Sequence, residues 1–329
     1  MGRLKALLIR ALFIGGLCTP AGSYAVNAKG VLYYGYKTWV GDGYQTEIHA
    51  RDLENGEDKT VFVLRGTGYY NFKAVDDGRA LIYGWVSARG KEYRVYKALR
   101  GDGSQEFAVT MEFESGNIPV TGIIYDETDK EIYINCHNDD EPFSGRQRYY
   151  FAKIDVTGRR PSLKVIKESP TPLLILKVIG VCIYYLKLGQ AGEELFYYNS
   201  FTDEEGFIGS LPPGSLDGVV TDDISFYIFS KYDKAERRKK VFCIPLLKGV
   251  GDKGVKNPKY VLPLGYSLSP NGYSAYLSSI IFHGVRSKGA GSGVTWSVRS
   301  LNTENWEATD LFEVDFTENT RPYIVGWTE

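Results

Sequence analysis

A tight turn followed by an alternating strand recurs along this chain, and this repeat constrains the fold more than any other feature. Each copy has a short apolar run, a polar turn, and then alternating apolar and polar residues, which is the pattern of a β-hairpin. A polar loop and two further strands follow, so that each unit supplies four strands. Copies of the turn lie at residues 75–80 (VDDGRA), 125–130 (YDETDK), 221–223 (TDD) and 269–273 (SPNGY).

The spacing of the units indicates how they are arranged. A period of about 50 residues is typical of the blades of a β-propeller, in which small sheets stand around a central axis. A sheet that cannot bury its apolar faces alone becomes stable by packing against its neighbours. The first strands of the units are expected to begin near Tyr69, Val120, Leu173, Gly218 and Tyr266.

The two ends of the chain complete each other in this arrangement. Residues 31–36 (VLYYGY) form a second strand with no first strand before it, and residues 323–327 (YIVGW) form a last strand with no successor. If the last strand supplies the missing first strand, six four-stranded antiparallel blades result and the seam has no unpaired edge. We therefore predict an all-β, six-bladed propeller over residues 26–329, closed by the C-terminal strand.

Other arrangements also fit short strands separated by turns. A β-sandwich does so, but it does not predict one regular four-stranded period. Seven blades would need a further unit hidden in a long insertion, and the candidates for it are loops. The apolar run at residues 173–188 could suggest a membrane span, but Lys177, Gly180 and Lys187 divide it into two strands and a turn.

The first 25 residues have the features of a secretory signal peptide. Arg3 and Lys5 precede an apolar stretch at residues 6–17, and residues 23–25 (SYA) form a small-x-small cleavage site. A membrane anchor is less favoured, because Arg10 interrupts a run already shorter than the roughly 20 apolar residues that a span needs. We expect a periplasmic or secreted protein with no transmembrane segment in the mature chain.

The content of charged residues, aromatic residues and cysteines limits the possible partners and structural classes of the protein. Lysine and arginine total 39 against 40 acidic residues, so no overall field exists to hold nucleic acid or an anionic membrane. The 25 tyrosines and 16 phenylalanines favour strands over helices. In the mature chain Cys136, Cys182 and Cys243 remain, none at metal-site spacing and each in an apolar run. We expect buried structural cysteines with at most one internal pair.

Several turns resemble those of a known family. Residues 269–276 (SPNGYSAY) and 76–81 (DDGRAL) are similar to the Ser-Pro-Asp-Gly hairpin of the TolB-like, WD40-like six-bladed propellers, and residues 51–57 (RDLENGE) resemble the turn between their third and fourth strands. The chain departs from that pattern in the fourth blade, where Ile179-Gly180 replaces the polar turn. The resemblance implies an extracytoplasmic scaffold that binds a protein or a small ligand over one face of the ring.

Loop length predicts which face of the ring binds a partner. Loops that join strands two to three share a face with those that join strand four to the next blade. Long two-to-three loops are expected at residues 137–148, 231–240 and 283–293, and their charged and aromatic content predicts a polar rim around one mouth of the channel. Exposed loops are hydrophilic in any case, which is the alternative interpretation. The predicted ligand- or partner-binding residues are Trp39, Asp42, Arg89, His137, Asp139, Asp140, Arg146, Arg237, Arg238 and Arg286.

Sequence patterns for catalysis or metal binding are mostly missing. The histidines are His49, His137 and His283, and His49 is expected on a third strand, away from the channel, so a three-histidine metal site is not favoured. No Gly-x-Ser-x-Gly elbow occurs, and residues 289–293 (GAGSG) lack the lysine and helix of a phosphate loop. We therefore predict no catalytic residue, metal or cofactor.

The predicted function is a monomeric binding scaffold that holds a protein partner or a small-molecule or glycan ligand, and no nucleic acid, on its long-loop face. The alternative is a propeller enzyme, such as a glycan lyase, a hydrolase or a lactonase-like protein, with carboxylates or His137 at the channel mouth. A third hypothesis is an architectural subunit of an envelope complex, which would have a stoichiometric partner.

Overall fold

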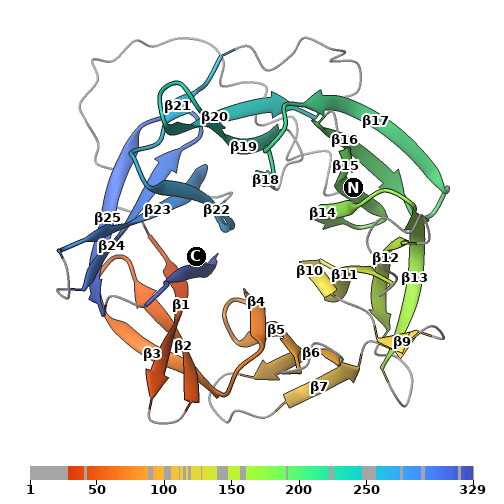
Figure 1. Cartoon of the computed structure of the whole chain (residues 1–329), viewed down its shortest axis with the longest axis horizontal. Coiled ribbons are helices and arrows are strands. Elements are labelled where there is room, and N and C mark those ends of the chain that lie inside the picture. The colour runs from red at the N-terminus through yellow and green to blue at the C-terminus, as the bar shows by residue number, and fades with distance from the viewer. Residues whose placement is uncertain are drawn as a thin grey trace, which may run out of the picture.

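Six small sheets stand around a central axis and form a closed ring (Figure 1). Each sheet has four antiparallel strands, so the predicted six-bladed propeller is confirmed. None of the described segments forms a helix long and apolar enough to cross a membrane. The computed structural model describes residues 29–40, 43–87, 92–99, 105–110, 112–113, 116–117, 120–126, 128–138, 147–155, 161–189, 192–221, 226–246, 257–274, 277–289, 293–317 and 320–328.

The blades follow one another along the chain, and each has its first strand innermost. Blade 1 consists of β26 (Tyr323–Thr328), β1 (Val31–Val40), β2 (Gly43–Asp52) and β3 (Asp58–Arg65). Blade 2 consists of β4 (Tyr69–Val75), β5 (Ala80–Val86), β6 (Tyr93–Leu99) and β7 (Gln105–Thr110). Blade 3 consists of β10 (Val120–Asp126), β11 (Glu131–His137), β12 (Tyr149–Asp155) and β13 (Ser162–Ser169).

The other three blades have the same order. Blade 4 consists of β14 (Leu173–Ile179), β15 (Cys182–Gly189), β16 (Gly192–Asn199) and β17 (Glu204–Leu211). Blade 5 consists of β18 (Asp217–Val220), β19 (Phe226–Asp233), β20 (Arg238–Pro245) and β21 (Tyr260–Val261). Blade 6 consists of β22 (Tyr266–Ser274), β23 (Ser279–Ser287), β24 (Val294–Asn302) and β25 (Ala308–Phe316). A small hairpin of β8 (Glu112–Phe113) and β9 (Gly116–Asn117) lies between blades 2 and 3.

The C-terminal strand closes the ring as predicted. β26 pairs with β1 in antiparallel register, with Tyr33 opposite Gly326 and Leu32 opposite Trp327. The indole Nε1 of Trp327 also donates a 3.0 Å hydrogen bond to the carbonyl oxygen of Lys29. β1 therefore has a strand paired on each edge, and β26 takes the innermost position that the first strand takes in the other blades.

The predicted blade starts agree closely with the structure. Four inner strands begin at the predicted residue, and the fifth, β18, begins one residue earlier, at Asp217. The turn at residues 76–79 joins β4 to β5 as expected, and its Asp76 ties blade 2 to blade 3. Burial acts to raise the pKa of Asp76, but hydrogen bonds from Lys130, Lys97 and Tyr125 prevail and lower it to about 2.

One predicted turn is wrong. The SPNGY segment at residues 269–273 lies inside β22, and the strand turns only after Ser274. The register shifts between Leu268 and Tyr273, so residues 269–272 form a bulge opposite Ile281. A proline and a glycine interrupt a strand in the same way whether the chain turns or bulges. A Cβ atom on Gly272 would lie 2.6 Å from the Cβ of Ile281, which explains the glycine.

Two of the three predicted long loops are shorter than expected. β19 continues to Asp233 and β20 begins at Arg238, so only residues 234–237 form the turn. Lys240 pairs with Asp233 across this hairpin at 2.8 Å, and such cross-strand ion pairs allow polar residues to continue a strand. β23 likewise continues to Ser287, which leaves residues 288–293 as the connection. The third segment, residues 138–148, does lie between β11 and β12.

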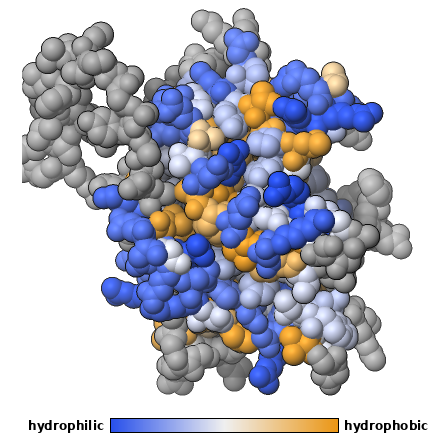
Figure 2. Space-filling model, turned by 90° about the vertical axis from the view of Figure 1, so that its left-hand side faces the viewer, coloured by the Kyte–Doolittle hydropathy of each residue, from blue (hydrophilic) through white to orange (hydrophobic). Residues whose placement is uncertain are grey.

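The core is divided among the interfaces between blades. The described residues form six apolar clusters, and each cluster consists of residues from two neighbouring blades. The outer strands alternate, as β25 does by burying Phe312 between exposed acidic residues. Figure 2 shows this side of the ring, where hydrophilic side chains cover most of the surface and apolar ones lie between them. Each blade is thus stabilised chiefly by its neighbours.

The three cysteines of the described chain are free thiols. Cys136 is buried, as predicted, and burial raises its pKa to about 12. Cys182 on β15 and Cys243 on β20 are only half-buried, which differs from the prediction. Burial still raises the pKa of Cys243, to about 11, so this thiol is unreactive at neutral pH.

Candidate ligand-binding pocket

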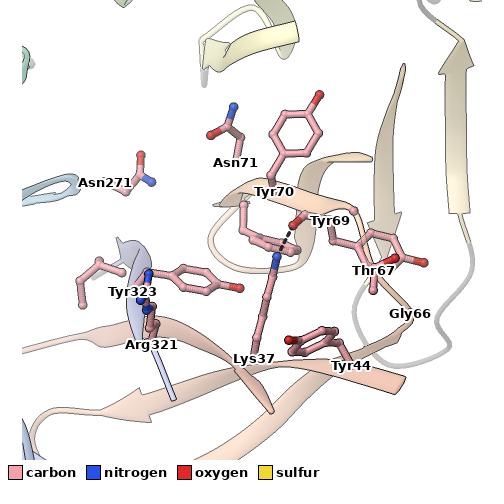
Figure 3. Close-up of a pocket in the computed structure, with 13 residues that line it drawn as sticks. Lys37, Tyr44, Gly66, Thr67, Tyr69, Tyr70, Asn71, Asn271, Arg321 and Tyr323 are labelled. Carbon is pink, nitrogen blue, oxygen red and sulfur yellow. Dashed lines mark hydrogen bonds between the residues drawn. The ribbon is translucent and has the colours of Figure 1, made fainter. Parts of the chain in front are cut away.

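A cavity of about 860 Å³ opens between blades 1 and 2, at one mouth of the central channel (Figure 3). It lies on the face that carries the two-to-three loops and the connections from strand four to the next blade. The end of β1, the start of β2, the β3–β4 connection, the first half of β4 and the start of β26 surround it. The lining residues are Lys37, Tyr44, Gly66, Thr67, Gly68, Tyr69, Tyr70, Asn71, Phe72, Asn271, Arg321, Tyr323 and Ile324.

Two tyrosines of the inner strands lie flat against glycines of the second strands. Tyr323 is opposite Gly35 and Tyr70 is opposite Gly84. A Cβ atom on Gly35 would come within 2.9 Å of the Tyr323 ring, and one on Gly84 within 2.6 Å of the Tyr70 ring. A glycine is therefore needed at both positions for the aromatic ring to reach the pocket wall.

A stack of aromatic rings behind Tyr323 supports this wall of the pocket. The ring of Phe72 lies 5.5 Å from that of Tyr323, with an angle of 18° between the planes, and so links β4 to β26. Phe72 also stacks on Tyr83 at 5.9 Å, and Tyr83 stacks on Tyr96 at 5.2 Å. Stacked rings with few rotatable bonds make a stiff wall, so we expect this pocket to be largely preformed.

Bulges in two inner strands place amide side chains at the border of the pocket and the channel. β4 shifts register between Tyr70 and Lys73, and Asn71 in this bulge has a left-handed backbone (φ 50°). Asn271 lies in the bulge of β22 and lines both the pocket and a second cavity of about 380 Å³ within the channel. Figure 3 shows the two asparagines across the opening from Lys37.

The charges of the pocket are not balanced. Lys37 and Arg321 line it, and none of the described lining residues is an aspartate or a glutamate. The ammonium of Lys37 donates a 2.7 Å hydrogen bond to the carbonyl oxygen of Tyr69, and burial lowers the pKa of Lys37. The buried hydroxyls of Tyr70 and Tyr323 have no hydrogen-bond partner within the described chain. Unpartnered polar groups of this kind are unusual and need an explanation.

Half of the predicted binding residues can be placed, and they do not converge on one concavity. Trp39, His137, Arg237, Arg238 and Arg286 lie at the ends of two-to-three hairpins in four different blades, on the expected face. None of them lines the pocket. Only Trp39 adjoins it, because its ring packs 4.8 Å from that of Tyr44 in an edge-to-face contact. The predicted residues outside the described part of the chain are Asp42, Arg89, Asp139, Asp140 and Arg146.

The histidines occupy three separate environments. His49 lies on β2, the third strand of blade 1, as predicted. His137 contacts the carbonyl oxygen of Asn138 at 2.8 Å. His283 is half-buried, and its Nδ1 accepts a 3.0 Å hydrogen bond from the indole Nε1 of Trp296. Burial and the nearby Lys239 lower the pKa of His283 to about 4, so that it is neutral at pH 7. No cluster of three or more potential metal ligands occurs among the described residues.

The polar residues that line the pocket were missed because none of them belongs to a recognisable sequence motif. One signal could have found them. The predicted pairing of residues 31–36 with residues 323–327 places the flanking residues Lys37 and Arg321 at the same end of blade 1. Two basic residues at one strand end, with tyrosines on either side, would then have indicated a site there.

Comparison with known proteins supports the fold. No protein-family model and no curated protein matches the sequence. Among solved structures, TolB from Acinetobacter baumannii has a TM-score of 0.60 at 12% identity, over 90% of this chain and 67% of that chain. A putative TolB from Agrobacterium tumefaciens has a TM-score of 0.53 at 10% identity, over 91% and 99%. Oligogalacturonate lyase from Vibrio parahaemolyticus has a TM-score of 0.52 at 14% identity, over 86% of both chains.

These similarities define a class of fold. The chain is a six-bladed β-propeller whose fold is similar to that of TolB, as the sequence predicted. At identities of 10% to 14% the shared feature is the fold, and a propeller fold carries many unrelated functions. Function has to be argued from the pocket itself.

Proposed function

We propose that this chain is an exported propeller that binds a small molecule or a glycan, without transforming it, in the pocket between blades 1 and 2. One observation carries the proposal: aromatic rings and a few polar groups converge on a cavity of about 860 Å³ at the channel mouth. Ligand sites have this character, with apolar walls for contact area and a few polar groups for orientation. A segment of a protein partner could enter the same pocket.

The wider face supports a larger partner or an extended ligand. Trp39 has 62% of its surface exposed and Tyr44 has 44%, and the two rings are in contact beside the pocket. Exposed aromatic residues beside a concavity are typical of binding surfaces. The rim residues Arg237, Arg238 and Arg286 share this face, so they would contact only a partner that covers much of the ring.

The signal-peptide pattern at residues 1–25 supports export. These residues lie outside the described part of the chain, so the support comes from the sequence alone. If export occurs as proposed, the mass of the exported chain corresponds to a protein that begins at Val26. An unprocessed mass from the exported fraction would contradict this cleavage site.

The catalytic alternative receives less support. The oligogalacturonate lyase from Vibrio parahaemolyticus shares the fold, but the fold alone carries no activity. The alternative requires carboxylates or His137 at the channel mouth, and neither is found among the described residues that line the pocket. A binding role needs only the groups that are present there.

A matched pair of tyrosine variants tests the proposed pocket. Tyr44 and Tyr232 are 44% and 51% exposed and lie on two-to-three hairpins of the same face, but only Tyr44 lines the pocket. We expect a thermal-shift screen with sugars, peptides and small acids to give ligands that stabilise the wild type. Calorimetry should then show at least about tenfold weaker binding for Tyr44→Ala and unchanged binding for Tyr232→Ala.

The reverse result would locate the site on the rim of blade 5. Recovery of the ligand chemically altered, as seen by NMR after incubation with the wild type, would favour the enzyme. A screen in which no compound of any class stabilises the protein would contradict a small-ligand pocket and favour the architectural role.

A further inference from the structure

The two cationic side chains in the pocket, Lys37 and Arg321, favour a ligand that carries a negative charge. Lys37 and Arg321 form no ion pair within the described chain, whereas several other lysines and arginines have carboxylate partners. Lys37 donates its one hydrogen bond to a neutral carbonyl, so its charge is not compensated by that contact. A half-buried ammonium without a counter-ion costs free energy in the empty protein. An anionic group in the pocket would recover that cost.

The other polar groups select against a bare inorganic anion. The amides of Asn71 and Asn271 and the hydroxyl of Thr67 line the same cavity. Each asparagine offers both a donor and an acceptor, which suits a ligand with neighbouring hydroxyl groups. Tyr70 and Tyr323 also line the cavity, and their hydroxyls are buried without a hydrogen-bond partner within the described chain. These groups are spread around a volume much larger than a phosphate or a sulfate needs.

The aromatic pair beside the pocket extends the site. Trp39 and Tyr44 present exposed ring surface next to the cationic groups, and Tyr44 belongs to both the pair and the pocket. Aromatic residues with an apolar body and a polar tip bind ligands that themselves have an apolar face and a polar edge. A pyranose ring has such a face, formed by its C–H bonds.

We infer that the ligand of this site is an acidic carbohydrate, whose carboxylate is bound by Lys37 and Arg321 and whose neighbouring sugar ring packs on Trp39. This inference rests on the proposed function and adds the class of ligand. Arg321 supplies a planar pair of donors that fits a carboxylate, and Lys37 supplies a point charge. The asparagines then contact hydroxyl groups towards the channel.

The test compares uronate trisaccharides with the same trisaccharides after reduction of their carboxyl groups. Galacturonate, glucuronate and mannuronate trimers are titrated into the full-length mature chain by calorimetry. We expect at least one acidic trimer to bind, and its reduced form to bind about tenfold or more weakly, because two charge-assisted contacts are lost.

Three variants separate the contribution of the two cationic side chains to binding from the contribution of the Trp39 ring. Arg321→Gln and Lys37→Met should each weaken the acidic trimer about tenfold and leave the reduced trimer unchanged. Trp39→Ala should weaken both forms by a similar factor. Arg286→Gln, which removes an exposed charge on the same face outside the pocket, is the matched control and should change neither.

Each alternative outcome overturns the inference in a recognisable way. Equal affinity for acidic and reduced trimers, with both weakened by Trp39→Ala, would reject the acidic class and leave the proposed pocket intact. Binding that survives all three variants would place the sugar elsewhere. If no trimer binds while another compound binds in a manner that depends on Tyr44, the ligand is not a carbohydrate but the proposed function stands.

Discussion

Blade 1 packs against blade 6 on one side and blade 2 on the other, and the two interfaces differ in whether their charged side chains have partners of opposite charge. At the interface with blade 6, His49 lies between Glu47 and Asp58, at 3.3 Å and 2.9 Å, and Arg51 contacts the same Asp58 at 3.3 Å. At the interface with blade 2, Lys37 and Arg321 have no carboxylate partner within the described chain. The charged side chains at the interface with blade 6 therefore have partners of opposite charge, whereas Lys37 and Arg321 have none among the described residues.

The aromatic residues differ in the same sense. Trp296, fully buried, contacts Tyr34 at 5.2 Å and Phe312 at 5.9 Å, and it fills the interface between blades 6 and 1. Tyr323 instead lies at a cavity, with its hydroxyl unpartnered. Groups that are satisfied within the fold stabilise it, whereas buried polar groups without a partner lower its stability and need another explanation. The comparison therefore assigns a structural role to the interface with blade 6 and supports the binding role proposed for the interface with blade 2.

The largest difference is expected when the aromatic centre of each interface is removed. Trp296→Ala should reduce the free energy of unfolding by about 3–5 kcal/mol, because it leaves a large closed cavity and removes the hydrogen bond to His283. Phe72→Ala should cost less, about 2–3 kcal/mol, because water from the adjoining pocket can fill the space that it leaves. Chemical denaturation of both variants gives the comparison, and an equal cost would mean that the pocket does not reach Phe72.

A smaller effect is expected from the charge cluster, and it should depend on pH. Burial acts to lower the pKa of His49, but its hydrogen bonds to Asp58 and Glu47 and their charges prevail and raise it. A histidine with a raised pKa stabilises the fold fully below about pH 6.5 and loses this contribution as the pH rises through the raised value. We expect His49→Gln to cost about 1–2 kcal/mol at pH 6 and markedly less at pH 9.

Other titratable side chains also change the stability with pH, so the experiment needs a control for them. Glu47 and Asp58 have lowered pKa values despite burial, so their contributions are lost only at more acidic pH. The pKa of His283 is lowered to about 4, so its contribution has the opposite sign and is lost as the pH falls below about 6.5. The difference between wild type and His49→Gln cancels the His283 term. A difference that is constant from pH 6 to pH 9 would show that His49 is not charged in the cluster.

The sequence predicted the ring well because the ring depends on a repeated local pattern. The turn at residues 76–79 and the two-residue turn at Gly180 lie where the residues indicated. The SPNGY segment was misplaced because proline and glycine mark both turns and bulges, and only the pairing with Ile281 decides between them. The sequence predicts a loop at the hairpin of β19 and β20 because its charged residues are hydrophilic, but these residues also pair across the two strands.

The pocket could not be predicted in the same way. Its residues come from both ends of the chain and from β4 and β22, and they meet only through closure of the ring. A linear pattern shows neither that the described residues around Lys37 include no carboxylate nor that Tyr323 packs flat on Gly35. Absence of compensation is a property of the folded neighbourhood, so it appears only once the blades are assembled.

The smallest expected change in the free energy of unfolding concerns Lys37, at the interface between blades 1 and 2. Lys37→Met replaces a desolvated ammonium by an apolar side chain of similar length, and it gives up one hydrogen bond to the carbonyl oxygen of Tyr69. The lost hydrogen bond costs about 1 kcal/mol and relief of the desolvated charge offsets about as much, so we expect a net change within about 0.5 kcal/mol.

The pH dependence gives this prediction its sign. The pKa of Lys37 is lowered in the folded chain, so the unfolded chain binds more protons at alkaline pH and the wild type gains stability there. Lys37→Met should therefore match the wild type near pH 7 and fall behind it as the pH approaches the ordinary lysine pKa. Denaturant unfolding at pH 7 and pH 10 measures both values. A loss of several kcal/mol at pH 7 would mean that Lys37 stabilises the fold, and the contrast between the two interfaces of blade 1 would then disappear.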